Sequence, residues 1–190
     1  MKIIGITGKS GAGKTTVTKY FKKHDAEIVD ADIIAREVVE SGMPALEEIK
    51  NEWQDVVSEG VLNRPALAKI VFNDAEELHK LNTITHKYIV EEIKQRIKKS
   101  KAPIFIIDAI ALFESGLSDL CDVTVCVTAD KDVRLKRIMA RDGLARIEAE
   151  ERINAQKSDD FYKEKADFVI LNNETESNLE EVADRIVKRE

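Results

Sequence analysis

The sequence predicts an α/β protein in which a five-stranded parallel sheet lies between two layers of helices. Short apolar runs alternate with helical patterns along the chain, and this alternation is typical of parallel sheets. The runs are apolar at nearly every position, as expected of strands buried on both faces. The first run leads directly into a glycine-rich motif. The predicted strands are Ile3–Ile6, Glu27–Val29, Ile104–Ile107, Val123–Val127 and Phe168–Leu171.

The glycine-rich motif, Gly8–Thr15, fits the pattern G-x-x-x-x-G-K-[ST] of the phosphate-binding P-loop. A predicted strand precedes it and a helical pattern follows it. In this context backbone N–H groups and the helix N-terminus bind phosphate oxygens. Lys14 is expected to reach the β- and γ-phosphates, and Thr15 to place its hydroxyl on Mg²⁺. The sequence therefore predicts a protein that binds a nucleoside triphosphate.

Composition narrows the classes of partner. The 190-residue chain carries a formal net charge of −6, which argues against general nucleic-acid binding. No apolar run approaches a membrane span, and no signal peptide precedes the P-loop. Cys121 and Cys126 match no metal or redox spacing, so we expect reduced cysteines of a cytoplasmic protein, with Cys126 in a strand. We expect a monomer or weak homo-oligomer without nucleic-acid or membrane partners.

The helical patterns predict two excursions from the sheet. Roughly seventy residues separate the second and third strands, which exceeds one crossover helix, and glycine and proline mark the joints. This insertion shows only helical patterns, at about Pro44–Gln54, Pro65–Phe72 and Ala75–Lys99. A closing amphipathic helix is expected at Ser177–Arg189. We divide a single P-loop domain into a core (about 1–40, 101–131 and 166–190), a helical insertion (about 41–100) and a second helical excursion (about 132–165).

Acidic residues follow the second and third strands, at the edge where ligands bind in open parallel sheets. Asp30 and Asp32 come after the second strand, and one of them is the natural acceptor for a hydroxyl proton during phosphoryl transfer. Asp30 could instead act only as the N-cap of a helix over Ile33–Glu40. Asp108 ends the third strand, where it could hold Mg²⁺ as a Walker-B aspartate does, or simply end the strand in a turn.

Arginines concentrate in the second excursion. Arg134, Arg137 and Arg141 are spaced three and four residues apart, so they line one face of a predicted helix. Such a face is either a solvated surface or a lid that closes over a triphosphate and neutralises its charge. Few acidic partners lie one helical turn away, and Asp130 is the clearest of them. We interpret the excursion as a lid. His86 has no metal-ligand partner at helical spacing and on spacing alone is a packing histidine.

As a set, these motifs resemble the dephospho-coenzyme A kinase family of P-loop kinases. The resemblance runs nearly end to end. Its most specific elements are Asp30-Ala31-Asp32, Leu112-Phe113-Glu114-Ser115-Gly116 and the Arg-x-x-x-Arg-Asp of Arg137–Asp142; further matches are Gly60–Arg64, His86, Arg152-Ile153, Gln156, Ala166-Asp167 and Asn172. The chain departs from the family pattern at Ala109–Ala111, where a proline and two leucines are usual, and at Asn63, where an aspartate is common.

The resemblance implies transfer of the γ-phosphate of ATP to the ribose 3′-hydroxyl of dephospho-CoA, the last step of coenzyme A synthesis. It implies that the insertion binds CoA and that the arginine-rich excursion is the lid. Asp32 would be the general base, and Lys14, Arg137 and Arg141 would complete the catalytic set. Thr15 and Asp108 would hold Mg²⁺, directly or through water.

The resemblance also implies two binding sets. Asn172 would lie near the adenine. The ATP-binding residues would be Gly8, Ser10, Gly11, Ala12, Gly13, Lys14, Thr15, Thr16 and Asn172. The acceptor-binding residues would be Asp32, Arg64, His86, Phe113 and Glu114.

Three other functions stay open from the residues alone: a kinase of the same fold acting on a nucleoside or nucleoside monophosphate, a GTPase switch, and an ATP-binding regulatory module. The GTPase is disfavoured because Thr128–Asp132 stands where Asn-Lys-x-Asp would follow the fourth strand. The regulatory module is disfavoured because binding alone needs neither paired aspartates nor lid arginines. A panel of acceptors would separate the two kinases.

Overall fold

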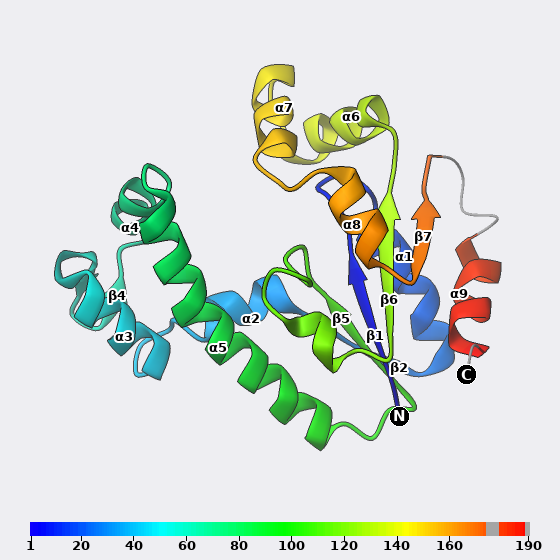
Figure 1. Cartoon of the computed structure of the whole chain (residues 1–190), viewed down its shortest axis with the longest axis horizontal. Coiled ribbons are helices and arrows are strands. Elements are labelled where there is room, and N and C mark those ends of the chain that lie inside the picture. Colours follow the sequence, from blue (N-terminus) through cyan, green and yellow to red (C-terminus); the bar gives the residue numbers. More distant parts are fainter. Residues whose placement is uncertain (174–178, 189–190) are drawn as a thin grey trace. The chain divides into compact units, whose positions relative to one another are not determined.

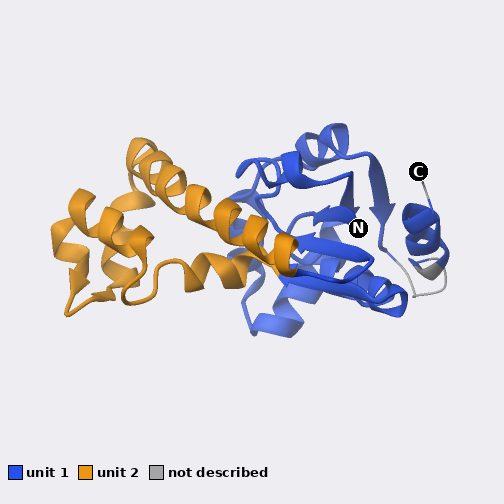
Figure 2. Cartoon of the chain, turned by 90° about the horizontal axis from the view of Figure 1, so that it is seen from below, with its two compact units in different colours: residues 1–29, 100–190 blue, residues 30–99 orange. Residues whose placement is uncertain are grey.

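The computed structural model describes residues 1–173 and 179–188, which form two compact units. The first unit contains residues 1–29 and the chain from residue 100 onward, and the second contains residues 30–99 (Figure 2). The second unit thus begins at Asp30, earlier than the boundary near residue 41 drawn from the sequence.

A five-stranded sheet with the order β2-β5-β1-β6-β7 forms the centre of the first unit. Strand β1 runs parallel to both of its neighbours, and β6 runs parallel to β7 (Figure 1). The predicted fold class is confirmed, because all five expected runs form strands of this one sheet. The strands are β1 (Lys2–Thr7), β2 (Ala26–Asp30), β5 (Ile104–Asp108), β6 (Val123–Thr128) and β7 (Phe168–Leu171).

Helices α1 (Lys14–Phe21) and α9 (Leu179–Lys188) pack beside each other against the sheet (Figure 1). Their buried apolar side chains, such as Phe21 and Ile186, join the central strands in one hydrophobic cluster. This burial is what holds such short helices in place, since helices of this length are marginal alone. Of the helix expected at Ser177–Arg189, the two named ends lie outside the described residues.

The arginine-rich excursion contains three helices, α6 (Lys131–Asp142), α7 (Arg146–Asn154) and α8 (Asp159–Lys165). Helix α6 directly follows the carboxyl end of β6 (Figure 1). Helices α6 and α7 share a small cluster of buried side chains, and α8 packs on β6. Two short 3₁₀ helices complete the unit, η1 (Lys22–His24) and η3 (Leu117–Leu120).

In the second unit the long helix α5 (Ala75–Lys99) packs against the other three α-helices. These are α2 (Ala31–Glu37), α3 (Pro44–Glu52) and α4 (Arg64–Val71), and a 3₁₀ turn η2 (Gln54–Val56) follows α3. The expectation of helical patterns alone was incomplete, because β3 (Val57–Ser58) and β4 (Val61–Leu62) form an antiparallel hairpin. A strand of two residues is too short to show the alternating pattern of apolar and polar side chains by which strands are predicted.

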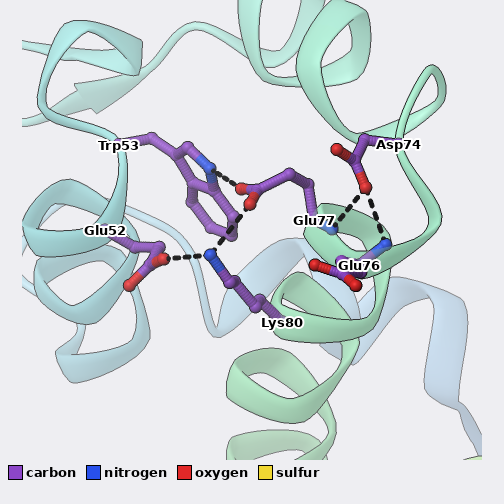
Figure 3. Close-up of polar contacts among 6 residues, drawn as sticks. All are labelled: Glu52, Trp53, Asp74, Glu76, Glu77 and Lys80. Atoms are coloured by element: carbon purple, nitrogen blue, oxygen red, sulfur yellow. Dashed lines mark hydrogen bonds and ion pairs between the residues drawn. The ribbon is translucent and has the colours of Figure 1, made fainter.

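A polar cluster joins the start of α5 to the end of α3 (Figure 3). Asp74 caps α5, because its carboxylate accepts hydrogen bonds from the N–H groups of the first turn. The indole N–H of the buried Trp53 donates to Glu77 over 2.6 Å. The ammonium of Lys80 lies 2.8 Å from Glu77 and 2.9 Å from Glu52. The cluster satisfies the polar atom of the tryptophan that it buries.

Both cysteines are free thiols, and Cys126 lies within β6 as predicted. Burial raises the pKa of Cys121 to about 12 and that of Cys126 to about 11, so both thiols stay protonated at neutral pH. None of the helices in the described part of the chain combines the length and apolar character that a membrane span needs.

Candidate active site

The P-loop lies between β1 and α1, the strand–loop–helix context that the motif predicts. Gly8 is at φ 143°, and a Cβ placed there would lie 2.0 Å from the carbonyl oxygen of Val127 in β6. Only glycine lets the backbone pass so close to the neighbouring strand. Lys14 opens α1, and its ammonium donates to the carbonyl of Gly8 over 3.3 Å.

Side chains from distant parts of the first unit support the P-loop backbone. The guanidinium of Arg137 donates to the carbonyls of Gly11 and Ala12, both over 3.3 Å. The amide of the buried Asn172 donates to the Ala12 carbonyl over 2.8 Å. The structure thus brings Arg137 and Asn172 to the loop that the sequence assigned to phosphate binding.

The three arginines that share one helical spacing have three different environments. Arg134 is only 3% exposed and forms a bidentate ion pair with Asp159, with both distances 2.8 Å. Arg137 reaches the P-loop, whereas Arg141 is exposed and pairs with its neighbour Asp142. The interpretation of these arginines as a uniformly solvated helix face is therefore wrong.

Two of these arginines form ion pairs with acidic residues that do not lie one helical turn away. Arg134 pairs with Asp159 rather than with Asp130, the clearest acidic residue at helical spacing, and Arg141 pairs with Asp142. The carboxylate of Asp142 accepts from Arg141 and from Arg152, each over 2.8 Å. The hydrogen bond from Arg141 holds the pKa of Asp142 below its ordinary value, so this carboxylate is charged at neutral pH.

Asp108 is the last residue of β5 and pairs in register with Ile6, two residues before the P-loop begins. The loop after it is fixed to β1, because the Ala109 N–H donates to the Ile6 carbonyl and the Thr7 hydroxyl to the Ile110 carbonyl. The small Ala109, one of the departures from the family pattern, is buried here.

Thr15 and Asp108 are of residue types whose oxygens bind Mg²⁺. Thr15 stands exposed in the first turn of α1 and offers a hydroxyl, while Asp108 offers a carboxylate. Within residues 1–173 and 179–188, no group of three or more His, Cys, Asp or Glu side chains could hold a metal ion. Mg²⁺ usually takes one or two protein oxygens and completes its shell with substrate phosphates and water, so a hydroxyl and a carboxylate are enough for such a site.

The structure gives different positions to the two aspartates at the end of β2, because Asp30 is the last residue of the strand and Asp32 lies in α2. A carboxylate oxygen of Asp30 accepts from the N–H groups of Asp32 and Ile33, over 2.8 and 3.3 Å, and so caps α2. Asp32 stands exposed in the first turn of the helix. The capping alternative is therefore correct for Asp30 and leaves Asp32 as the candidate proton acceptor.

Arg64 and His86 lie in the same unit as Asp32. Arg64 is exposed at the start of α4 and donates to the carbonyl of Arg36 in α2 over 3.4 Å. Asn63 caps α4 by accepting from the Ala66 N–H over 3.1 Å, which an aspartate could also do. This departure from the family pattern thus keeps the helix start intact. His86 lies half-buried on α5.

A family model described as dephospho-CoA kinase matches residues 2–178. The chain belongs to the dephospho-CoA kinase family. A dephospho-CoA kinase of Listeria monocytogenes is 41% identical over 179 residues, which cover 92% of this chain and 90% of the relative. One of Moorella thermoacetica is 45% identical over 162 residues, 82% of this chain and 76% of the relative. A crystal structure from Thermus thermophilus superposes with a TM-score of 0.84 at 31% identity, and the match covers 98% of this chain and 96% of that one.

The protein is accordingly an ATP-dependent P-loop kinase of coenzyme A biosynthesis, as the resemblance implied. Membership of this family excludes the three alternatives that the residues alone left open: a GTPase switch, an ATP-binding regulatory module and a kinase acting on a nucleoside or nucleoside monophosphate. The match over residues 2–178 also covers the helical insertion and the arginine-rich excursion, so it does not depend on the P-loop alone.

Phe113 and Glu114, which the resemblance assigned to acceptor binding, follow β5 and contact α8. The Tyr162 hydroxyl donates to Glu114 over 3.1 Å, and the Phe113 ring stands edge-on to Phe161 at 6.4 Å between centroids. Gln156 accepts from the P-loop N–H of Ser10 over 2.9 Å. Sequence reasoning gave no role to Gln156, Phe161 or Tyr162, because no periodic spacing links residues so far apart.

Proposed function

We propose that this kinase transfers the γ-phosphate of ATP to the ribose 3′-hydroxyl of dephospho-CoA, giving coenzyme A and ADP. One observation carries the proposal: a P-loop whose backbone is held by an arginine of the following lid helix, in a chain of the dephospho-CoA kinase family. We also propose that it acts in the cytoplasm as a monomer or weak homo-oligomer, without nucleic-acid or membrane partners.

On the ATP side, the P-loop amides and Lys14 bind the β- and γ-phosphates, and the positive end of α1 faces them. Arg137 binds the P-loop backbone in this structure, and its guanidinium binds a phosphate oxygen of ATP. Arg141 joins it from one turn further along α6. Their charges offset the negative charge on the equatorial oxygens in the transition state, and Asn172 lies on the adenine side of the loop.

On the acceptor side, Asp32 orients the ribose hydroxyl and takes its proton as the bond to phosphorus forms. The capping of α2 by Asp30 fixes the backbone of Asp32 through its N–H. Arg64 and His86 bind the acceptor from the same unit, and Phe113 and Glu114 bind it from the loop after β5. Positioning and electrostatics supply most of the catalysis in such transfers.

Thr15 and Asp108 would hold Mg²⁺ together with the phosphates of ATP, Asp108 directly or through water. The ion supplies charge neutralisation on the β- and γ-phosphates when bound. The residues of this chain keep the two phosphates in place around it through Lys14 and the loop amides.

A direct test measures ADP release from ATP and Mg²⁺ with dephospho-CoA, adenosine, AMP and CMP offered separately. We expect turnover with dephospho-CoA alone and a product that co-migrates with coenzyme A. Lys14→Ala should abolish it at saturating substrates. Turnover with a nucleotide instead would contradict the acceptor assignment, and the Ala109–Ala111 loop would be the first place to look for the cause. Full activity of Lys14→Ala would contradict the P-loop assignment.

A further inference from the structure

We propose that the segment 156–162, which leads into α8 and forms its first turn, positions both substrate loops of the kinase. Gln156 at its start holds the P-loop, and Tyr162 at its end holds the loop that carries Phe113 and Glu114, here called the acceptor loop. The proposal rests on the proposed function, because it takes these two loops as the donor and acceptor sides. All of its contacts lie within the first unit.

At the donor end, the side-chain oxygen of Gln156 accepts from the N–H of Ser10 over 2.9 Å. Ser10 is itself buried. This bond engages a backbone group of the P-loop rather than a side chain, so it fixes the path of the loop. A small displacement of the loop would misplace every amide that binds phosphate, and positioning errors of this kind are costly in catalysis.

In the middle, Asp159 anchors the segment to the lid helix α6. Its carboxylate forms two 2.8 Å hydrogen bonds with the guanidinium of Arg134, which is almost fully buried. Bidentate pairs of this kind are directional and strong. Ser158 caps α8 by accepting from the Phe161 N–H over 3.2 Å. The segment therefore has a fixed backbone and a fixed relation to the helix that carries Arg137.

At the acceptor end, Tyr162 is 2% exposed and its hydroxyl donates to Glu114 over 3.1 Å. The neighbouring Phe161 packs edge-on against Phe113, and the ammonium of Lys165 lies over both phenylalanine rings, at 5.2 and 6.0 Å. Burial and the nearby Glu114 raise the pKa of Tyr162, so its hydroxyl remains a donor throughout the physiological range. These contacts hold the acceptor loop to α8 at two successive residues.

Gln156, Asp159 and Tyr162 are spaced three residues apart, and the last two are neighbours on the surface of α8. Each touches a different partner: the P-loop, the lid helix and the acceptor loop. Gln156 and Tyr162 are therefore positioning residues, since they act through Ser10 and Glu114 rather than on substrate. Each should affect the apparent affinity for its own substrate and leave the other nearly unchanged.

Two single substitutions test this division. Tyr162→Phe removes the hydroxyl but keeps the packed ring, and it should raise KM for dephospho-CoA about three- to tenfold while KM for ATP stays within about twofold. Gln156→Ala should do the reverse, raising KM for ATP and sparing that for dephospho-CoA. Tyr20→Phe, the same change on a tyrosine of α1, is the control and should shift neither constant.

A purely structural role would give a different pattern. It would lower Tm and kcat in both variants without separating the two KM values, and that result would overturn the proposal. So would a variant that raises both KM values equally or leaves both within about twofold of wild type. In a Glu114→Ala background, Tyr162→Phe should add nothing further, because its partner is already gone; independent, multiplicative effects would contradict the link.

Hydrogen exchange separates this proposal from the proposed function. Without any substrate, Tyr162→Phe should speed amide exchange in residues 113–116, and Gln156→Ala should speed it in residues 9–13. In each case the increase in exchange rate should reflect the stabilisation of the loop that the lost hydrogen bond provided. Unchanged exchange in both loops would overturn the positioning role whatever the enzyme phosphorylates. Faster exchange together with no turnover of dephospho-CoA by wild type would overturn the acceptor assignment alone.

Discussion

Asp30 and Asp32 show how two identical side chains two residues apart have different environments. The carboxylate of Asp30 is turned back onto the backbone of α2, where it satisfies two N–H groups of the first turn. Asp32 is inside the helix and cannot cap it, so its carboxylate is exposed. Position relative to the helix start, rather than residue type, determines which of the two aspartates caps α2, and this is why we propose Asp32 rather than Asp30 as the proton acceptor.

Asp32→Asn should lower kcat at least about 100-fold, because loss of a general base typically costs two to four orders of magnitude. KM for ATP should hardly change, since Asp32 belongs to the acceptor side. Steady-state kinetics with each substrate varied separately would measure both constants. Asp30→Ser keeps an oxygen that can cap α2 and should retain activity. A normal kcat in Asp32→Asn would exclude Asp32 as the base.

Gly8→Ala should destabilise the protein by roughly 2–4 kcal/mol and abolish ATP binding. The added Cβ meets a backbone oxygen of β6, which cannot move aside without disturbing the sheet. Gly143→Ala is the matched control, because Gly143 also has a positive φ, 68°, but nothing lies within 4 Å of its Cβ position. It should cost only about 1 kcal/mol of strain. Equal losses in urea unfolding would show that the clash is unimportant.

At the scale of elements, the start of α5 illustrates how a long polar helix is fixed in place. Much of α5 faces solvent, and of its residues Ala75–Lys99 only Ile89 and Ile93 are buried. The cluster of Trp53, Glu77 and Lys80 ties its first turns to α3 through hydrogen bonds (Figure 3). Hydrogen bonds and ion pairs therefore add to apolar burial in holding the start of α5 against the end of α3.

Glu77→Gln should destabilise the protein at pH 7, and the difference from wild type should shrink in acid. Hydrogen bonds from Lys80 and then Trp53 hold the pKa of Glu77 below its ordinary value of 4.5. A lowered folded-state pKa means that the contribution is complete above 4.5 and is lost as pH falls through the lower value. Urea unfolding at a series of pH values would measure the difference.

Glu76→Gln is the control for this prediction, because it removes the same charge from the same helical turn but from an exposed side chain (Figure 3). Its effect on stability should be small at every pH. A gap between Glu77→Gln and wild type that is the same at pH 7 and well below pH 4.5 would show that the charge on Glu77 is unimportant.

At the scale of the whole molecule, the proposed roles divide between the two units. The P-loop, Asp108 and Arg137 belong to the first unit, whereas Asp32 and His86 belong to the second. The first unit is a complete parallel sheet with its own core, and the second is a helical insertion built around α5.

Hydrogen exchange with each substrate should show this division. A non-hydrolysable ATP analogue should slow exchange in the P-loop and α6, and dephospho-CoA should slow it in α2, α4 and the middle of α5. The reason is that a ligand stabilises most strongly the segments that it contacts. Lys14→Ala should lose the first effect and keep the second. Protection by dephospho-CoA that is confined to the first unit would contradict the acceptor role of Arg64 and His86.

Much of the fold could be predicted from short stretches of the sequence. The five strands follow from short apolar runs, and the P-loop follows from eight consecutive letters with a strand before and a helix after. These features depend on neighbours in the chain, which the sequence displays directly. The hairpin at Val57–Leu62 was not predicted, because a two-residue strand is too short to show an alternating pattern of apolar and polar residues. Its turn is at Glu59-Gly60, where both residues have a positive φ.

The candidate site shows where such prediction ends. Helical spacing put Arg134, Arg137 and Arg141 on one face, but spacing does not indicate which of them is buried. That depends on Asp159, which lies 25 residues further along the chain and forms the ion pair with Arg134.

The sequence by itself determined the fold class, the phosphate-binding loop and the family, because these depend on periodicity and on contiguous motifs. Only the tertiary structure decided that Asp30 caps a helix, that Arg137 rather than Arg134 reaches the P-loop, and that Gln156 and Tyr162 hold two loops. Each of these outcomes depends on burial or on a hydrogen-bond partner, and most of those partners are distant in the chain. The packing of the sheet and helices brings them together.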